Sequence, residues 1–404
     1  MISPMIDRSV GSTGTKKAKV IKDWGAIRAE KFDAAYAEAL DFCGFGLFHV
    51  LGIKKFAVTQ SQAAFDGSYY ITQVPSAPSY VPSLYGTMAG DVMTFYERLY
   101  NWSMTVLWDI ILEQLQIPYI QEIFDHFDGF PPLKDLVDLV SNASLVFLNS
   151  DPLVDFPRPT SHRVVHVGGI VDNGEHKPVN KAYQLPEGYK AAIQNTILKF
   201  PDVTFIWKYE KPEHRVSEGI PNLIEATWIP QVDILYDSRL TAFVTHGGQG
   251  SITEAYAAGV PLLVIPIGYD QFRNAHQVVR NGAGAVLDKA MLGSTVHLEV
   301  AIRDLIDNAD RFSANARKLS SMVKDRPFSP KETFVRHMEF MAEHGPLRML
   351  DHEGRHLNFF QFYLLDVFAF LAAVLMLAVL VIFLFVRAIL RVLFGTDQRK
   401  DKLE

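Results

Sequence analysis

Cysteine is nearly absent from this sequence, and positive charge is not in excess. Cys43 is the single cysteine among 404 residues, so no disulfide can form within the chain. One cysteine does not identify a redox compartment. Asp and Glu number 45 against 39 Lys and Arg, which gives a net charge of −6 at pH 7. This balance argues against a general nucleic-acid binder, because such proteins depend on a basic surface.

The first 25 residues lack the continuous apolar core of a secretory signal. Internal repeats and low-complexity tracts are missing from the whole sequence. An unbroken apolar run of 20 residues does occur near the other end, from Val367 to Val386. It has the length of a helix that crosses a bilayer, whereas a buried helix of a soluble domain is the alternative.

Basic residues follow this run, at Arg387, Arg391, Arg399, Lys400 and Lys402. The positive-inside rule predicts a cytosolic tail over 387–404 and a lumenal location for the bulk of the chain. A lumenal domain needs an N-terminal signal, so we expect the N-terminus of this sequence to be incomplete. The last two lysines resemble the dilysine retrieval signal of endoplasmic-reticulum membrane proteins, with an ordinary basic tail as the alternative. In the lumen, the Asn-X-Ser triplets at Asn101 and Asn142 would be candidate glycan acceptors, although such triplets are common by chance.

The most informative stretch runs from Leu240 to Gln277. An apolar, β-rich segment ends in Thr245 and His246, and a glycine-rich turn with Gly247, Gly248 and Gly250 follows. Ser251 is predicted to open a helix that stops at Gly259, and a second buried strand and a second helix come next. This order is the repeat unit of a parallel α/β sheet.

Ligands bind such sheets at the carboxyl ends of their strands. A helix N-terminus after glycines presents free N–H groups, which suit a phosphate or diphosphate. Glu254, one turn into the helix, is placed to accept from ribose hydroxyls, and Asp270 and Gln271 follow the next strand. Taken singly, His246 or Glu254 is more often an ordinary loop or cap residue. The ordered set indicates a ligand site.

The residues of this region carry a resemblance. WIPQ from Trp228 to Gln231, FVTHGGQGSITEA, GVPLLVIPI and the Asp270–Gln271 pair resemble the signature of the UDP-glycosyltransferases, most closely the animal UDP-glucuronosyltransferases. The resemblance implies the α/β GT-B fold, in which two Rossmann-like domains face a cleft. It implies an incomplete acceptor-binding domain over 1–150 and a UDP-sugar-binding domain over 151–345. A linker over 346–362 and a transmembrane helix over 363–386 precede the basic tail.

The resemblance also assigns roles to residues. Trp228 stacks on uracil, with a core tryptophan as the alternative, and Gln231 contacts the nucleoside. His246, Gly248, Gly250 and Ser251 hold the diphosphate, although many relatives carry Asn where this chain has Gly250. Glu254 holds the ribose, and Asp270 and Gln271 hold the sugar hydroxyls. No metal and no cofactor are implied, because the UDP-sugar is a co-substrate.

Two departures from the family pattern stand out. The family uses a base histidine near the N-terminus, oriented by a carboxylate; Glu38 matches the carboxylate, after a strand expected over 32–37, but the histidine has no counterpart. His49 lies on an apolar helix and is interpreted as structural. A strand with a glycine–serine turn, expected between the loop after HVGGI and the helix at Glu187, is also missing. The sequence thus resembles a family member shortened twice, by splicing or by an imperfect gene model.

A long helix rich in aromatic residues is predicted over 91–116, with those residues interpreted as packing residues or as the lining of an apolar acceptor pocket. The function implied is inverting sugar transfer from a UDP-sugar, UDP-glucuronate or UDP-glucose, to a small lipophilic acceptor at the endoplasmic-reticulum membrane. An inactive, membrane-anchored isoform that modulates active family members in homo- or hetero-oligomers is the main alternative. An unrelated α/β domain that binds another nucleotide is a weaker one.

Overall fold

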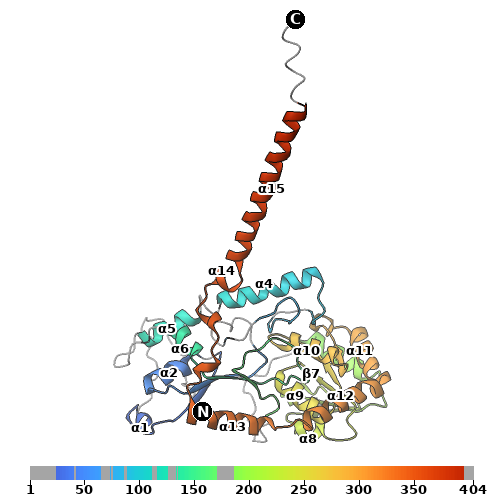
Figure 1. Ribbon diagram of the computed structural model, residues 1–404. Helices are drawn as coiled ribbons and strands as arrows, with labels where there is room; N and C mark the ends of the chain where they lie inside the picture. Colours follow the sequence, from blue (N-terminus) through green and yellow to red (C-terminus); the bar gives the residue numbers. More distant parts are fainter. Residues whose placement is uncertain are drawn as a thin grey trace, which may run out of the picture. The chain divides into compact units, whose positions relative to one another are not determined.

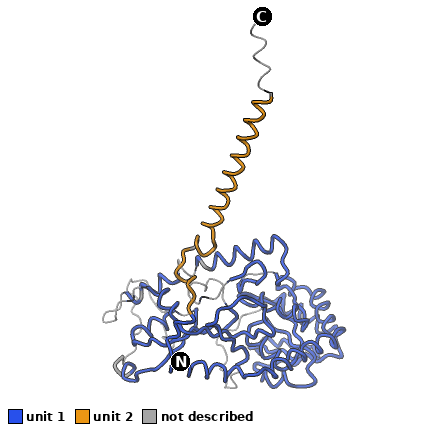
Figure 2. The backbone as a smooth tube through the Cα atoms, viewed as in Figure 1, with its two compact units in different colours: residues 1–350 blue, residues 351–404 orange. Residues whose placement is uncertain are grey.

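A computed structural model describes residues 24–40, 42–64, 73, 76–85, 89–111, 116–125, 133, 135–170 and 186–394. The chain forms two compact units, 1–350 and 351–404 (Figure 2). The strands are β1 (Ala35–Glu38), β2 (Phe56–Gln60), β3 (Leu145–Leu148), β4 (Val164–His166), β5 (Phe205–Lys208), β6 (Leu223–Ala226), β7 (Phe243–Thr245), β8 (Leu262–Val264) and β9 (Gly284–Val286). The helices are α1 (Trp24–Ala29), α2 (Cys43–Leu51), α4 (Phe95–Ile111), α5 (Ile117–Asp125), α6 (Leu136–Ser141), α7 (Glu187–Ile197), α8 (Gln231–Leu235), α9 (Gln249–Ala258), α10 (Gln271–Arg280), α11 (Thr295–Asp307), α12 (Ala309–Lys324), α13 (Pro330–His344), α14 (Phe359–Phe362) and α15 (Leu365–Phe394).

The first half of unit 1 is built on a parallel four-stranded sheet with the order β1-β2-β3-β4. Every residue of β3 is buried and apolar, as expected for a strand covered on both faces. One face packs on α2 and α6, through a cluster that includes Phe45 and Leu136. The other face packs on α13, where Met341 and Phe334 meet Phe147.

The boundary of this sheet differs from the expected domain division at residue 150. Both β4 and α13 come after that position, yet β4 pairs with β3, with Val164 opposite Val146. Helix α13 belongs with the first half because its apolar face is buried against the sheet of that half. The chain reaches α13 from α12, which lies in the second half.

In the described residues, the second half of unit 1 has two parallel sheets, β5-β6 and β7-β8-β9. Helix α7 packs against both, because Ile193 touches the hydrophobic cluster of each. Ile206, Ile224 and Val244, on β5, β6 and β7, are 46%, 53% and 48% exposed, although strands of a parallel sheet are normally buried on both faces. The sequence predicts that one strand of the family pattern is missing before the helix at Glu187. This place in the chain, 171–185, lies outside the described residues, so the expectation stays a prediction.

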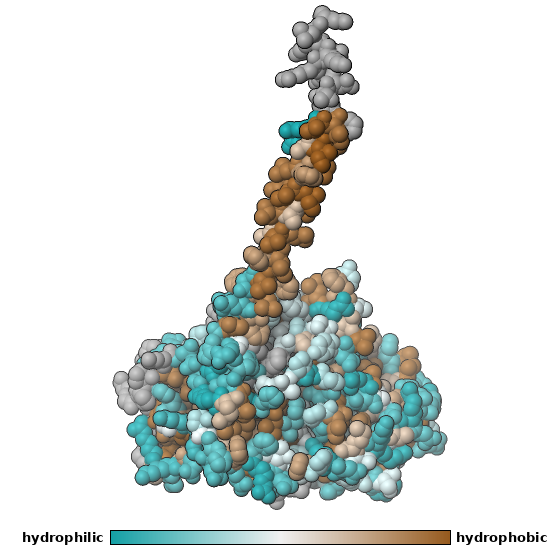
Figure 3. Space-filling model, viewed as in Figure 1, coloured by the Kyte–Doolittle hydropathy of each residue, from teal (hydrophilic) through white to brown (hydrophobic). Residues whose placement is uncertain are grey.

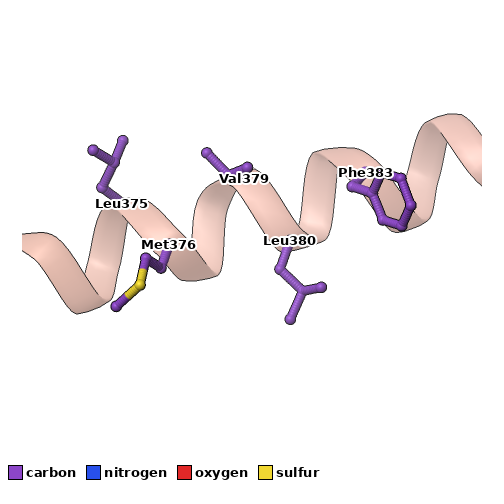
Figure 4. A pocket seen from close by; sticks show the side chains of 5 residues that line it. All are labelled: Leu375, Met376, Val379, Leu380 and Phe383. Atoms are coloured by element: carbon purple, nitrogen blue, oxygen red, sulfur yellow. The ribbon is translucent and has the colours of Figure 1, made fainter.

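Unit 2 contains α15, whose visible face is almost entirely apolar (Figure 3) and whose apolar side chains are exposed along most of its length. Leu365–Leu393 is the one segment of the described chain that is helical, long and apolar enough to cross a membrane, and none of its most apolar window is buried. The groove lined by Leu375, Met376, Val379, Leu380 and Phe383 is a shallow feature of this single helix, with side chains that point to opposite sides (Figure 4). We therefore treat it as part of the helix surface and not as a ligand site.

Two expected elements have different bounds in the structure. Strand β1 ends at Glu38 and not at Ala37, so Glu38 is the last residue of the strand. The aromatic helix begins at Phe95 and not at residue 91 because Thr94 and Glu97 form a capping box: Glu97 Oε2 accepts from Thr94 N at 2.7 Å and Thr94 Oγ1 accepts from Glu97 N at 3.4 Å.

Candidate active site

The glycine-rich turn after β7 requires glycine for steric reasons. Thr245 pairs with Val264 of β8, and the chain then turns at Gly247 with φ of +85°. A Cβ on Gly247 would lie 2.5 Å from Val264 Cγ1, and one on Gly248 would lie 2.8 Å from His246 Nε2. The turn thus packs tightly against β8 on one side and holds the His246 ring against Gly248 on the other.

Helix α9 begins directly after this turn. Gly248 is its N-cap residue, and no side chain caps the first-turn N–H groups. These groups carry the positive end of the helix dipole, which suits an anion. A Cβ on Gly250 would meet no atom within 4 Å. The Cβ of a larger residue at this position would therefore meet open space.

The loop after β6 is tied to α9 by hydrogen bonds. Gln231 begins α8, and its Nε2 donates to Glu254 Oε2 at 2.6 Å and to Ser251 Oγ at 3.5 Å. Trp228, in the same loop, is 56% exposed. The structure thus brings three predicted site residues together and leaves a face of the indole accessible. A core position for Trp228 is excluded.

The loop after β8 is tied to the glycine-rich turn by a residue that the sequence did not single out. Asn274 is fully buried, and its Nδ2 donates to Gly247 O at 2.9 Å and to Asp270 Oδ2 at 2.8 Å. It thereby joins the ends of β7 and β8. The signal available in the sequence was its position four residues after Asp270, which places both side chains on one face of α10.

Burial sets the electrostatics of this pair of loops. Desolvation lowers the pKa of His246 below 6.5, opposed by the charge of Asp270. Desolvation raises the pKa of Asp270 above 3.8, opposed mainly by its hydrogen bond from Asn274 and also by the charge of His246. At pH 7 the His246 ring is therefore neutral, with one N–H available to donate.

The side chain of Gln271 braces its own loop. Its Oε1 accepts from Ile267 N at 2.8 Å and from Gly268 N at 3.0 Å. These bonds use the acceptor end of the Gln271 amide.

The nine predicted donor-site residues therefore lie after three strands, β6, β7 and β8, and the hydrogen bonds of Gln231 and Asn274 connect the loops that carry them. Figure 1 shows α8, α9, α10 and β7 together in one part of unit 1. A family model described as "UDP-glucoronosyl and UDP-glucosyl transferase" matches residues 15–188 and 181–400. The chain belongs to this family. The two matched segments overlap at residues 181–188, next to the place where the sequence predicts a missing strand.

Two curated relatives of this glycosyltransferase show the extent of the similarity. Human UDP-glucuronosyltransferase 1A4 is 30% identical over 378 residues, which cover 88% of this chain and 69% of the relative. Rat UDP-glucuronosyltransferase 1A7 is 28% identical and covers 88% of this chain and 69% of the relative.

Solved structures confirm the GT-B fold. Phytolacca americana UGT2, complexed with UDP-2fluoro-glucose and pterostilbene, superposes with a TM-score of 0.52 at 15% identity, covering 79% of each chain.

Glu38 of the glycosyltransferase lies at the carboxyl end of β1, in the sheet of the first half of unit 1. Its Oε2 accepts from Ser61 N at 3.0 Å, just after the neighbouring strand β2. The role of Glu38 in orienting a base stays a prediction. In the described ranges, no group of three His, Cys, Asp or Glu side chains is arranged to hold a metal ion.

The expected glycan at Asn101 is wrong for this fold. Asn101 is 0% exposed, and its Nδ2 donates to Pro78 O at 2.8 Å and to Val81 O at 2.9 Å. A glycan is attached through this same nitrogen, so the folded chain has no room for one. Asn142, the other triplet, is only partly buried.

Proposed function

We propose that this UDP-glycosyltransferase binds a UDP-sugar across the carboxyl ends of β6, β7 and β8 and transfers the sugar to a small lipophilic acceptor. The observation that carries the proposal is the convergence of three loops through Gln231–Glu254, Asn274–Gly247 and Asn274–Asp270. The loop after β6 carries side chains that suit a nucleoside. The turn after β7 carries groups that suit a diphosphate, and the loop after β8 carries side chains that suit a sugar.

Each part of the donor has a matching group. The exposed indole of Trp228 offers a stacking surface for the base, and Gln231 and Glu254 offer hydrogen bonds to the nucleoside and the ribose. The first-turn amides of α9, with Ser251 and the neutral His246, suit the diphosphate. Asp270 and the amide nitrogen of Gln271 suit sugar hydroxyls. UDP-glucuronate and UDP-glucose are the donors we favour from the family name.

The reaction is displacement at the anomeric carbon. The acceptor hydroxyl attacks this carbon from the face opposite the diphosphate, the bond from carbon to the UDP oxygen breaks with its electron pair on oxygen, and the configuration inverts. In the family the acceptor proton passes to a base histidine oriented by a carboxylate; Glu38 matches the carboxylate, and the histidine has no counterpart in this sequence. Hydrogen bonds to the diphosphate stabilise the charge that develops on the leaving UDP.

We also propose that α15 anchors the enzyme in the endoplasmic-reticulum membrane as a single span, with unit 1 in the lumen. Arg387 and Arg391 lie at the carboxyl-terminal end of this helix, which supports a cytosolic location for that end. Association with further copies or with other family members remains part of this proposal.

The test uses the full chain in membranes of a host without this activity. The first measurement is the Kd for UDP-glucuronate and UDP-glucose, and the second is glycoside formation with a phenolic acceptor such as 4-methylumbelliferone. We expect His246→Ala to weaken donor binding about tenfold or more, because a hydrogen bond to a charged group contributes about 1.5–3 kcal/mol. His297→Ala, an exposed histidine on α11, is the matched control and is expected to bind like the parent.

The outcomes separate the candidate functions. Product that depends on His246 supports the proposed transfer. Donor binding without product would favour an inactive, membrane-anchored isoform. Absence of measurable donor binding by the parent chain would contradict the site itself.

A further inference from the structure

Helix α4 exposes its apolar side and buries its polar side. Asn101 and Thr105 are 0% and 6% exposed, whereas Phe95, Leu99 and Trp102 are 65%, 49% and 54% exposed. A helix on the surface of a water-soluble domain shows the opposite pattern. Figure 1 shows α4 at the periphery of unit 1. The expectation that these aromatic residues are packing residues within the fold is therefore wrong for this side of the helix.

The orientation of α4 about its own axis is fixed by the buried side. Asn101 Oδ1 accepts from Ser83 N at 2.7 Å, and its Nδ2 donates to Pro78 O and Val81 O. Trp108, on the same side, lies 4.9 Å from the ring of Tyr85. Rotation of the helix to hide its apolar side would break all three Asn101 bonds, each at a cost of about 1–3 kcal/mol.

The exposed side carries an apolar stripe with an exposed polar residue beside it, Ser103, whose Oγ donates to Leu99 O at 2.7 Å. Residues at positions 95, 99, 102, 106 and 110 follow the spacing of one helix face, and they are Phe, Leu, Trp, Val and Ile. Tyr96, Tyr100 and Leu107 widen it and are 79%, 46% and 46% exposed. An exposed apolar surface of this kind marks an interaction site.

The chain itself indicates what covers this stripe. Leu347 and Leu350 pack in the core of unit 1, and α15 begins at Leu365. A linker of this length spans at most about 50 Å when fully extended. If α15 crosses a bilayer, unit 1 stays within about 50 Å of the bilayer surface, so lipid is within reach of the stripe. The composition of the stripe also favours contact with a membrane, because it contains Trp and Tyr, which concentrate at the interface between membrane and water.

We propose that α4 lies in the plane of the membrane interface, with Phe95, Leu99, Trp102 and Ile110 in the acyl boundary. This proposal rests on the proposed span of α15 and does not depend on donor binding. Glu97 and Asp109 outnumber Arg98 in α4, so the contact is apolar and does not require anionic lipid.

The contact has a consequence for the active site. Trp108 packs on Tyr85, and Tyr85 lies 6.4 Å from the ring of Tyr269, the residue before Asp270. Two aromatic contacts, Trp108–Tyr85 and Tyr85–Tyr269, therefore connect α4 with the loop proposed to hold the sugar. Lipophilic acceptors dissolved in the bilayer would reach this part of the enzyme without crossing bulk water.

The test places a single nitroxide on the full chain in phosphatidylcholine nanodiscs. Cys43→Ala provides a cysteine-free background, and Leu99→Cys carries the label on the stripe. Val300→Cys, 64% exposed on α11, is the matched control in water, and Leu377→Cys on α15 is the control in lipid. Power saturation compares the accessibility to oxygen, which concentrates in lipid, with that to a water-soluble nickel complex. We expect the ratio at 99 to exceed that at 300 severalfold and to approach that at 377.

Three results would overturn the proposal. A ratio at 99 equal to that at 300 would place α4 in water. Low accessibility to both reagents, together with dipolar coupling between labels, would show that a second copy covers the stripe. A water-like ratio at 377 would remove the span on which the proposal rests.

A second measurement needs no label. Phosphatidylcholine brominated in its acyl chains should quench the tryptophan emission of the parent chain, and Trp102→Phe should abolish most of that quenching. Quenching that is unchanged in Trp102→Phe would contradict insertion of the stripe. Donor affinity, expected to be unchanged, verifies that the variant is folded.

Discussion

At the scale of single residues, the neutral state of His246 gives the site a pH dependence. UDP-glucose carries a diphosphate diester whose charge does not change between pH 5.5 and 7.5. Its negative charge beside His246 favours the imidazolium and raises the pKa of His246 in the complex. The free protein holds this pKa below 6.5, so the complex binds more protons than the free protein as the pH falls through this range. Affinity should therefore increase toward lower pH.

We expect the Kd for UDP-glucose to fall about threefold to tenfold between pH 7.5 and pH 5.5, because the bound diphosphate raises the pKa of His246 and protonation of His246 then favours the complex. Isothermal titration calorimetry in two buffers of different ionisation enthalpy would also detect the proton uptake. His246→Gln keeps Asp270 and should lose the slope. A slope that survives in this variant would assign the titration to another group.

At the scale of elements, α10 joins the two halves of unit 1 through two arginines. Arg273 is 1% exposed; it pairs with Asp155 at 2.7 Å and donates to Pro82 O at 3.3 Å. Arg280 also pairs with an aspartate at 2.7 Å, Asp91, but its side chain is 35% exposed. Both guanidinium groups lie near the ring of Phe156. They differ chiefly in burial.

This pair of arginines permits a matched test. Arg273→Met leaves the carboxylate of Asp155 buried without its cation, which should lower the free energy of unfolding by about 3 kcal/mol. Arg280→Met breaks a solvent-exposed pair and should cost about 0.5 kcal/mol. Denaturant unfolding of the full chain in detergent gives both values. Equal losses would show that the buried pair does not hold the two halves together.

The sequence predicted elements and loops better than it predicted the contacts between them. Positive φ at Gly247 and the series of strands and helices around it followed from local chemistry. The bond between Gln231 and Glu254 did not, because it joins residues 23 positions apart that only the folded sheet brings together. The packing of α13 on the first sheet did not follow from local chemistry for the same reason, because α13 lies far in the sequence from the strands that it covers.

At the scale of the whole molecule, the interrupted sheet of the second half should affect stability unevenly. In the described residues, β5 and β6 pair only with each other, whereas β8 pairs on both edges and is fully buried. A two-stranded ribbon is marginal without further support. Segments with few buried contacts and exposed backbone bonds open locally at low free energy.

We therefore expect the amides of β5 and β6 to exchange hydrogen at least about tenfold faster than those of β8, a difference of about 1.4 kcal/mol in opening free energy. Hydrogen-exchange mass spectrometry of the full chain in nanodiscs measures both, with peptides over 204–209 and 261–266. Strand β7 is an internal comparison, because within the described ranges it pairs along one edge and should fall between the two. Equal protection of β5 and β8 would mean that another strand pairs with the open edge of β5, and the second half would then have a continuous sheet.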